Sequence, residues 1–270
     1  MLGSLYYEQY AGWYDGADVE GGPSAPFFDN SNGLQGLEFV DPLASPSPDD
    51  TYGTMEWYEV GATVPGDGPK SFIDIVTFAS TDGEAGDGEW GMGEEFIITE
   101  LIHTNNALTS NGSDFPDPLW IADAVANFYV YDVDGGTELL ADTNSVTTIS
   151  FWETQNQDTC SDSPSSPAPL GTNCDDIFRV TAATLAPVEF DYDGWTYTIT
   201  FGLAPGPSFD DEGNESITLV CQGGAETCSD ETTVPPAEIG VGEIWVFTPE
   251  TAPGTSSLFV TASWTAREIP

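Results

Sequence analysis

The sequence predicts an all-β protein: an antiparallel two-sheet β-sandwich of the jelly-roll type, with roughly ten to twelve strands and long acidic loops. Three observations support this prediction. Short runs of β-branched and aromatic residues alternate with turns, no long segment has a helical period, and glycine (29) and proline (20) are abundant. Since 39% of the 270 residues are hydrophobic, we expect residues 1–270 to form one domain around one core.

The first expected strand lies in the aromatic stretch 6–14, inside an N-terminal segment, 1–30. This segment is either an ordinary first strand or an arm that docks on a neighbouring subunit. The clearest apolar run is 95–103, and residues 206–243 are expected to be an insertion or loop excursion. The alternation of apolar and polar residues predicts further strands at 54–60, 71–79, 124–133, 145–152, 177–184, 188–192, 195–203, 217–221, 244–248 and 258–264.

The charge is strongly one-sided. The chain has 46 acidic and 3 basic residues, a formal charge of −43. Such a surface repels phosphate backbones, which argues against nucleic-acid binding, and it keeps a protein soluble in a salty or cation-rich medium. No apolar run is long enough to span a bilayer, so direct membrane insertion is not expected.

The four cysteines fall into two local pairs in loop-like sequence, Cys160 with Cys174 and Cys221 with Cys228. An even number of cysteines with only one histidine in the chain favours disulfides over a zinc site. We expect these two local pairings, although sequence alone leaves the other pairings open. Disulfides imply an oxidising compartment, so the protein is expected to be secreted or displayed on a cell surface.

Two polar corners follow apolar strands. The first contains His103 and Asn105, and the second contains Glu153 and Asn156. Their main expected role is structural, because buried polar groups usually serve to satisfy other buried polar groups. We further expect the two corners to meet in the core. A metal-binding role and a catalytic role for His103 remain alternatives.

Carboxylate clusters suggest calcium, which prefers oxygen ligands. Asp132 and Asp134 begin a segment that resembles a calcium loop, and Asp175 and Asp176 form a second cluster. The competing interpretation is that these residues occupy hairpin turns and solvated loops, where aspartate is common. No nucleophile elbow, phosphate loop or dinucleotide motif occurs, and no catalytic residue is assigned.

Four motifs in order resemble the choice-of-anchor K domain, or THxN family, of exported bacterial proteins that often carry a PEP-CTERM sorting tail. Ile102-His103-Thr104-Asn105 is similar to its Thr-His-x-Asn motif, with isoleucine in place of the first threonine. The other three are Gly53-Thr54-Met55-Glu56-Trp57, the block from Glu153 through Cys160 to Cys174-Asp175-Asp176-Ile177, and Gly194 to Thr200. The resemblance spans about residues 50–205. It implies export and surface display without an enzymatic activity.

The expected function is therefore non-enzymatic: a secreted structural module of a cell surface or extracellular matrix. It would self-associate into filaments if its N-terminal strand added to the sheet of a neighbour. The alternative is a calcium-assisted, lectin-like module that binds an extracellular glycan. A polysaccharide hydrolase comes third, because it would require a specific pair of carboxylates.

Overall fold

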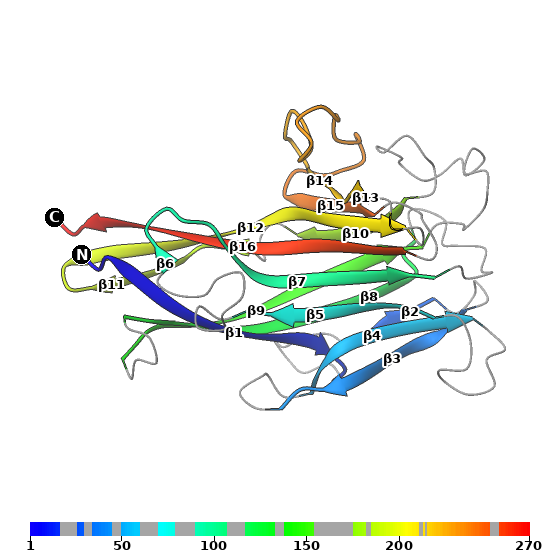
Figure 1. The fold of residues 1–270 in the computed structure, drawn as a ribbon, viewed down its shortest axis with the longest axis horizontal. Helices are drawn as coiled ribbons and strands as arrows, with labels where there is room; N and C mark the ends of the chain where they lie inside the picture. The colour runs from blue at the N-terminus through cyan, green and yellow to red at the C-terminus, as the bar shows by residue number, and fades with distance from the viewer. Residues whose placement is uncertain are drawn as a thin grey trace.

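The computed structural model describes residues 1–16, 26–29, 34–44, 50–59, 70–78, 90–106, 117–132, 138–153, 175–181, 185–210, 213, 215–248 and 254–270. These residues form an all-β structure of sixteen strands, all paired antiparallel, as Figure 1 shows. The expected number of ten to twelve strands was too low. Two of the additional strands are only two residues long, and a third, residues 34–42, has too irregular an alternation to stand out in the sequence.

The strands have these bounds: β1 Ser4–Tyr14, β2 Phe27–Phe28, β3 Leu34–Pro42, β4 Thr51–Glu59, β5 Lys70–Thr77, β6 Trp90–Gly91, β7 Phe96–Asn105, β8 Trp120–Tyr131, β9 Leu139–Trp152, β10 Asp176–Thr181, β11 Val188–Tyr192, β12 Trp195–Asp210, β13 Glu215–Ile217, β14 Leu219–Gln222, β15 Glu243–Thr248 and β16 Gly254–Glu268. The described residues contain no helix long and apolar enough to cross a membrane.

The strands join edge to edge in the order β11-β12-β16-β7-β5-β4-β1-β8-β9-β10-β15-β14, and this sheet curls into a half-barrel. The pairing between neighbouring strands changes most sharply at β1. Strand β1 pairs with β8 from Tyr6 to Trp13, but with β4 only through Trp13–Tyr52 and Tyr14–Thr51. The first strand of the chain thus lies in the middle of the sheet, between the two halves of the curl.

Strand β1 shows why the sequence folds this way. In a strand, alternate side chains point to the same face. Leu5, Tyr7 and Trp13 are fully buried on the inner face of the curl, together with Ala11. Two of the aromatic residues that suggested an N-terminal arm, Tyr7 and Trp13, therefore pack into this chain's own core, whereas Tyr6 and Tyr10 are half-buried at alternate positions.

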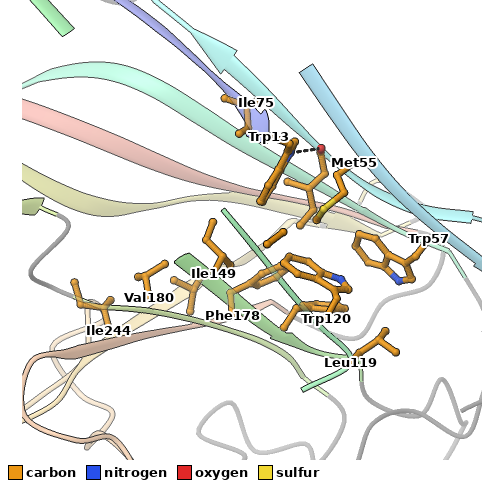
Figure 2. Packing of buried hydrophobic residues seen from close by; sticks show 14 of the residues in the cluster. Trp13, Met55, Trp57, Ile75, Leu119, Trp120, Ile149, Phe178, Val180 and Ile244 are labelled. Carbon is orange, nitrogen blue, oxygen red and sulfur yellow. Dashed lines mark hydrogen bonds between the residues drawn. The ribbon is translucent and has the colours of Figure 1, made fainter. Parts of the chain in front are cut away.

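Two aromatic clusters fill the interior. The first cluster, partly drawn in Figure 2, contains Trp13, Trp57, Trp120, Phe151 and Phe178 with aliphatic neighbours. The second, towards the end where both termini lie, is built around Tyr7, Trp90, Tyr197 and Trp264. Each fully buried large side chain contributes about 2–3 kcal/mol through the hydrophobic effect, so these clusters account for much of the stabilisation of the curl.

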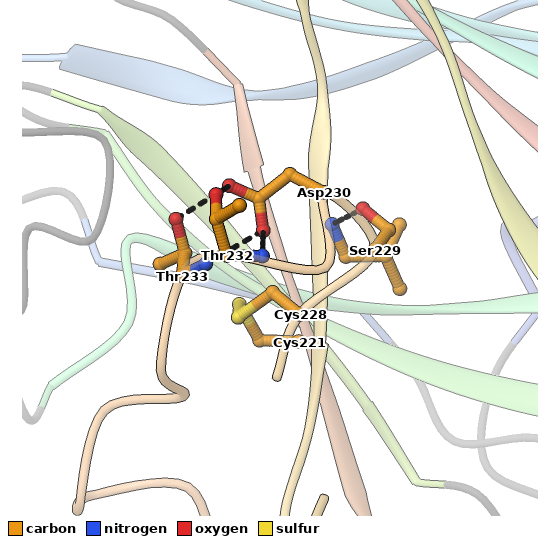
Figure 3. The surroundings of a disulfide bond; sticks show 7 residues. Cys221, Cys228, Ser229, Asp230, Thr232 and Thr233 are labelled. Carbon is orange, nitrogen blue, oxygen red and sulfur yellow. Dashed lines mark hydrogen bonds between the residues drawn. A yellow bond between two sulfur atoms is a disulfide. The ribbon is translucent and has the colours of Figure 1, made fainter. Parts of the chain in front are cut away.

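A third cluster lies beneath the segment 223–242, which connects β14 to β15. It contains Trp152, Trp245 and Phe247 and the disulfide between Cys221 and Cys228, which the sequence predicted. Next to the disulfide, Asp230 accepts hydrogen bonds from the backbone N–H groups and hydroxyls of Thr232 and Thr233 (Figure 3). These bonds, led by those from Thr233, hold the pKa of Asp230 well below its usual range. Cys160 and Cys174 lie outside the described residues.

Candidate functional site

The two polar corners meet through Trp57. The indole ring of Trp57 stacks on the His103 imidazole, with ring centroids 5.8 Å apart, and its Nε1–H donates a 3.0 Å hydrogen bond to Glu153 Oε2. Strands β4 and β7 and the residue after β9 supply these three side chains, which are all buried. The sequence indicated two corners but gave no sign that a tryptophan from β4 would join them.

Asn105 makes the second connection between distant parts of the chain. Its Nδ2–H donates to Asp176 Oδ2 over 2.9 Å, which ties the end of β7 to the start of β10. Ser71 Oγ also lies 3.5 Å from Asn105 Oδ1 and accepts a hydrogen bond from the backbone N–H of Asn106. Both Asn105 and Asp176 are buried. This corner therefore joins three strands, β5, β7 and β10, through side-chain hydrogen bonds.

His103 is held mainly by ring contacts. Besides Trp57, its ring packs edge-on against Phe151 and Phe178, and its Nδ1 lies 3.4 Å from Thr248 Oγ1. Its Nε2 is buried and has no hydrogen-bond partner among the described residues. Burial lowers the pKa of His103 to about 3. The imidazole is therefore neutral near pH 7 and too weakly basic to serve there as an effective general base.

The other predicted site residues are dispersed. Asp175 is buried beside Asp176 at the start of β10, while Asp132 is half-buried at the end of β8. Asn156 and Asp134 lie outside the described residues. Among the residues whose placement is described, no group of three or more His, Cys, Asp or Glu side chains lies close enough together to hold a metal ion.

A cavity of about 420 Å³ lies inside the curl, and His103 lines it. Its walls come from the inner faces of most of the long strands, and aliphatic side chains dominate them. Sequence reasoning did not identify this cavity. The available signal was the row of small residues Ala122, Ala124 and Ala126 between Trp120 and Phe128 on alternate positions of β8. A polar corner joined by hydrogen bonds therefore borders an apolar space.

Comparison of the sequence with known protein families and with curated proteins finds no match.

Proposed function

We propose that this protein is a non-enzymatic, secreted structural module of a cell surface or extracellular matrix. The single observation that carries this proposal is the position of β1. The first residues of the chain form a strand in the middle of the sheet, paired with β8 over most of its length and with β4 at its end, and made of residues consecutive in sequence. A strand of this kind can be supplied by a second copy of the chain without loss of any native contact.

The curled sheet also suits a jelly-roll-like sandwich. One layer would be β11-β12-β16-β7-β5-β4 and the other β1-β8-β9-β10-β15-β14, with the bend between them at the short β1–β4 pairing. Two hydrogen bonds link β1 to strands beyond this bend. Trp13 Nε1–H donates to the carbonyl of Ile73 over 3.0 Å, and Thr99 Oγ1–H donates to Gln9 Oε1 over 2.7 Å. In this arrangement β1 would connect the two layers, and its exchange between copies would link them firmly.

Three further features support an extracellular structural role. The Cys221–Cys228 disulfide suits an oxidising environment. The net charge of −43 suits a salty medium, where screening weakens repulsion between copies. The hydrogen bond between Asn105 and Asp176 joins β7 to β10, as expected for residues with a structural role.

The exchange is tested by placing single cysteines on facing residues of different chains. Tyr10 lies opposite Asn127 in the β1–β8 pairing. When a Tyr10→Cys chain and an Asn127→Cys chain of different tag length are mixed, unfolded, and refolded together in molar potassium chloride, we expect a disulfide-linked heterodimer on denaturing electrophoresis. Filaments or oligomers should be visible in negative stain.

The matched control mixes Tyr10→Cys with Val241→Cys, because Val241 is 91% exposed and takes no part in the β1–β8 pairing. Equal cross-linking in both mixtures would reveal random collision rather than strand exchange. Monomers at every concentration, with no heterodimer from the facing pair, would overturn the assembly proposal.

A further inference from the structure

The cavity exists because of side-chain size. On the inner face of β8, Trp120 and Phe128 belong to the two aromatic clusters, and only alanines lie between them. On β1, Gln9 and Ala11 occupy the corresponding stretch between Tyr7 and Trp13. Protein interiors are normally close-packed, with few voids larger than a water molecule. A space of about 420 Å³ is therefore larger than an ordinary packing defect. Its volume falls in the range of small-molecule binding sites.

The lining is uncharged. None of the described residues that line the cavity is Asp, Glu, Lys or Arg, although the chain carries 46 acidic residues. Its histidine, His103, is neutral near pH 7 because burial lowers its pKa to about 3. A charged group placed here would lose its hydration without gaining an ion-pair partner. The cavity thus favours an uncharged occupant.

Polar but uncharged side chains also line this space, among them Gln9, Thr99, Ser145 and Ser257. Thr99 and Gln9 bond to each other. Apolar sites typically fix the orientation of a ligand with a small number of polar contacts.

The cavity is not fully enclosed. Among the described strands, β10 pairs with β9 only along Ile149–Trp152. Asn144 and Val146, from the part of β9 that β10 does not pair with, are among the lining residues, and both are exposed; Val146 has 42% of its surface accessible.

We propose that this cavity binds one uncharged, largely apolar small molecule. Apolar cavities of roughly 150 Å³ bind benzene, so a larger molecule fits here. The inference is independent of strand exchange, because the cavity belongs to each folded unit whether β1 comes from the same chain or from another copy.

Two fluorescent probes with related frameworks test the charge argument. N-phenyl-1-naphthylamine is uncharged, while 8-anilinonaphthalene-1-sulfonate carries a sulfonate. For the folded chain in molar potassium chloride, we expect saturable binding of one N-phenyl-1-naphthylamine per chain and binding of the sulfonate more than about tenfold weaker. Absence of saturable binding of the uncharged probe, or equal affinity for both probes, would overturn the proposal.

A filling substitution and a control substitution test whether the probe binds inside the cavity. Ala126→Trp should abolish binding by filling the space, while Val241→Trp, at an exposed position, should leave it unchanged. Near-ultraviolet circular dichroism verifies that each variant is folded. Should Ala126→Trp fail to fold, the smaller change Ala124→Leu serves in its place, with a several-fold loss of affinity expected. A folded filling variant that binds the probe as well as wild type would show that binding occurs elsewhere.

Discussion

The two ends of the interior differ in how their polar atoms are satisfied. At the second cluster, Trp90 Nε1–H donates to the carbonyl of Glu94, Trp264 Nε1–H to that of Trp90, and Tyr7 Oη–H to that of Ile97. At the first cluster, the buried atoms His103 Nε2 and Trp120 Nε1 have no such partner among the described residues.

This difference suggests that the two clusters have different roles. Well-folded cores rarely leave buried donors or acceptors unpaired, so each exception calls for a physical explanation. The second cluster is packed and bonded as expected for a part that only stabilises the fold. Of the two residues with unpaired atoms, His103 lines the cavity and Trp120 packs against Trp57 of the polar corner. Sites that deviate from the rules of stability are commonly functional.

The largest expected effect comes from the fully bonded end. Trp264→Ala removes a fully buried indole and its hydrogen bond to Trp90, and it should lower the free energy of unfolding by about 3–5 kcal/mol. Denaturant unfolding at constant salt measures this loss. A loss below about 1 kcal/mol would mean that this end does not carry the stability assigned to it.

The second prediction concerns acid. The folded pKa of His103 is about 3 and its unfolded value is 6.5, so below pH 6.5 the unfolded state binds the proton more readily. Stability contributed by the neutral ring is thus complete above pH 6.5 and is lost as the pH falls towards 3. Between pH 7 and pH 5 this loss should be about 2 kcal/mol.

His103→Phe removes the titrating group, so the variant should lose about 2 kcal/mol less than the wild type over this pH interval. Because most carboxyl groups titrate at lower pH, the comparison of the two proteins isolates the histidine. Identical pH dependence of unfolding in both proteins would show that His103 is protonated in the folded state or is not buried as described.

The smallest expected effect is the sharpest test of the comparison. Trp13 and Trp120 are both fully buried in the first cluster. Trp13 donates a hydrogen bond to the carbonyl of Ile73, whereas Trp120 Nε1 has no partner among the described residues. Replacement of each by phenylalanine removes a similar volume. Trp13→Phe should therefore be more destabilising than Trp120→Phe by about 1 kcal/mol. Equal losses in thermal or denaturant unfolding would indicate that Trp120 Nε1 has a partner in solution.

Local patterns could be predicted because they depend on neighbouring residues. The alternation in 195–203 and 244–248 predicted strands β12 and β15 close to their observed positions, and the short spacing of Cys221 and Cys228 predicted their disulfide. Strand β3 was missed, and β12 extends to Asp210 inside the segment expected to be an insertion. The continuation of β12 to Asp210 depends on its pairing with β16, which lies far away in sequence.

The candidate site was only partly predictable. The sequence indicated that His103, Asn105 and Glu153 end apolar strands, and it placed Asp175 and Asp176 in a carboxylate cluster. It could not show that Asn105 would bond Asp176 or that Trp57 would lie between His103 and Glu153. Those contacts join residues 71 and 96 positions apart in the chain, and they exist only once β4, β7, β9 and β10 have curled together.

The sequence by itself determined the all-β class, the acidic surface and the identity of the residues that prefer a buried face, because composition and alternation act locally. Only the tertiary structure decided that β1 lies in the middle of the sheet and that small residues from several strands face one another across an open space. Strand order and register follow from long-range pairing, in which each strand has many partners of similar local pattern. The cavity, and the end of the core where some buried polar atoms have no partner among the described residues, are consequences of that strand order and register.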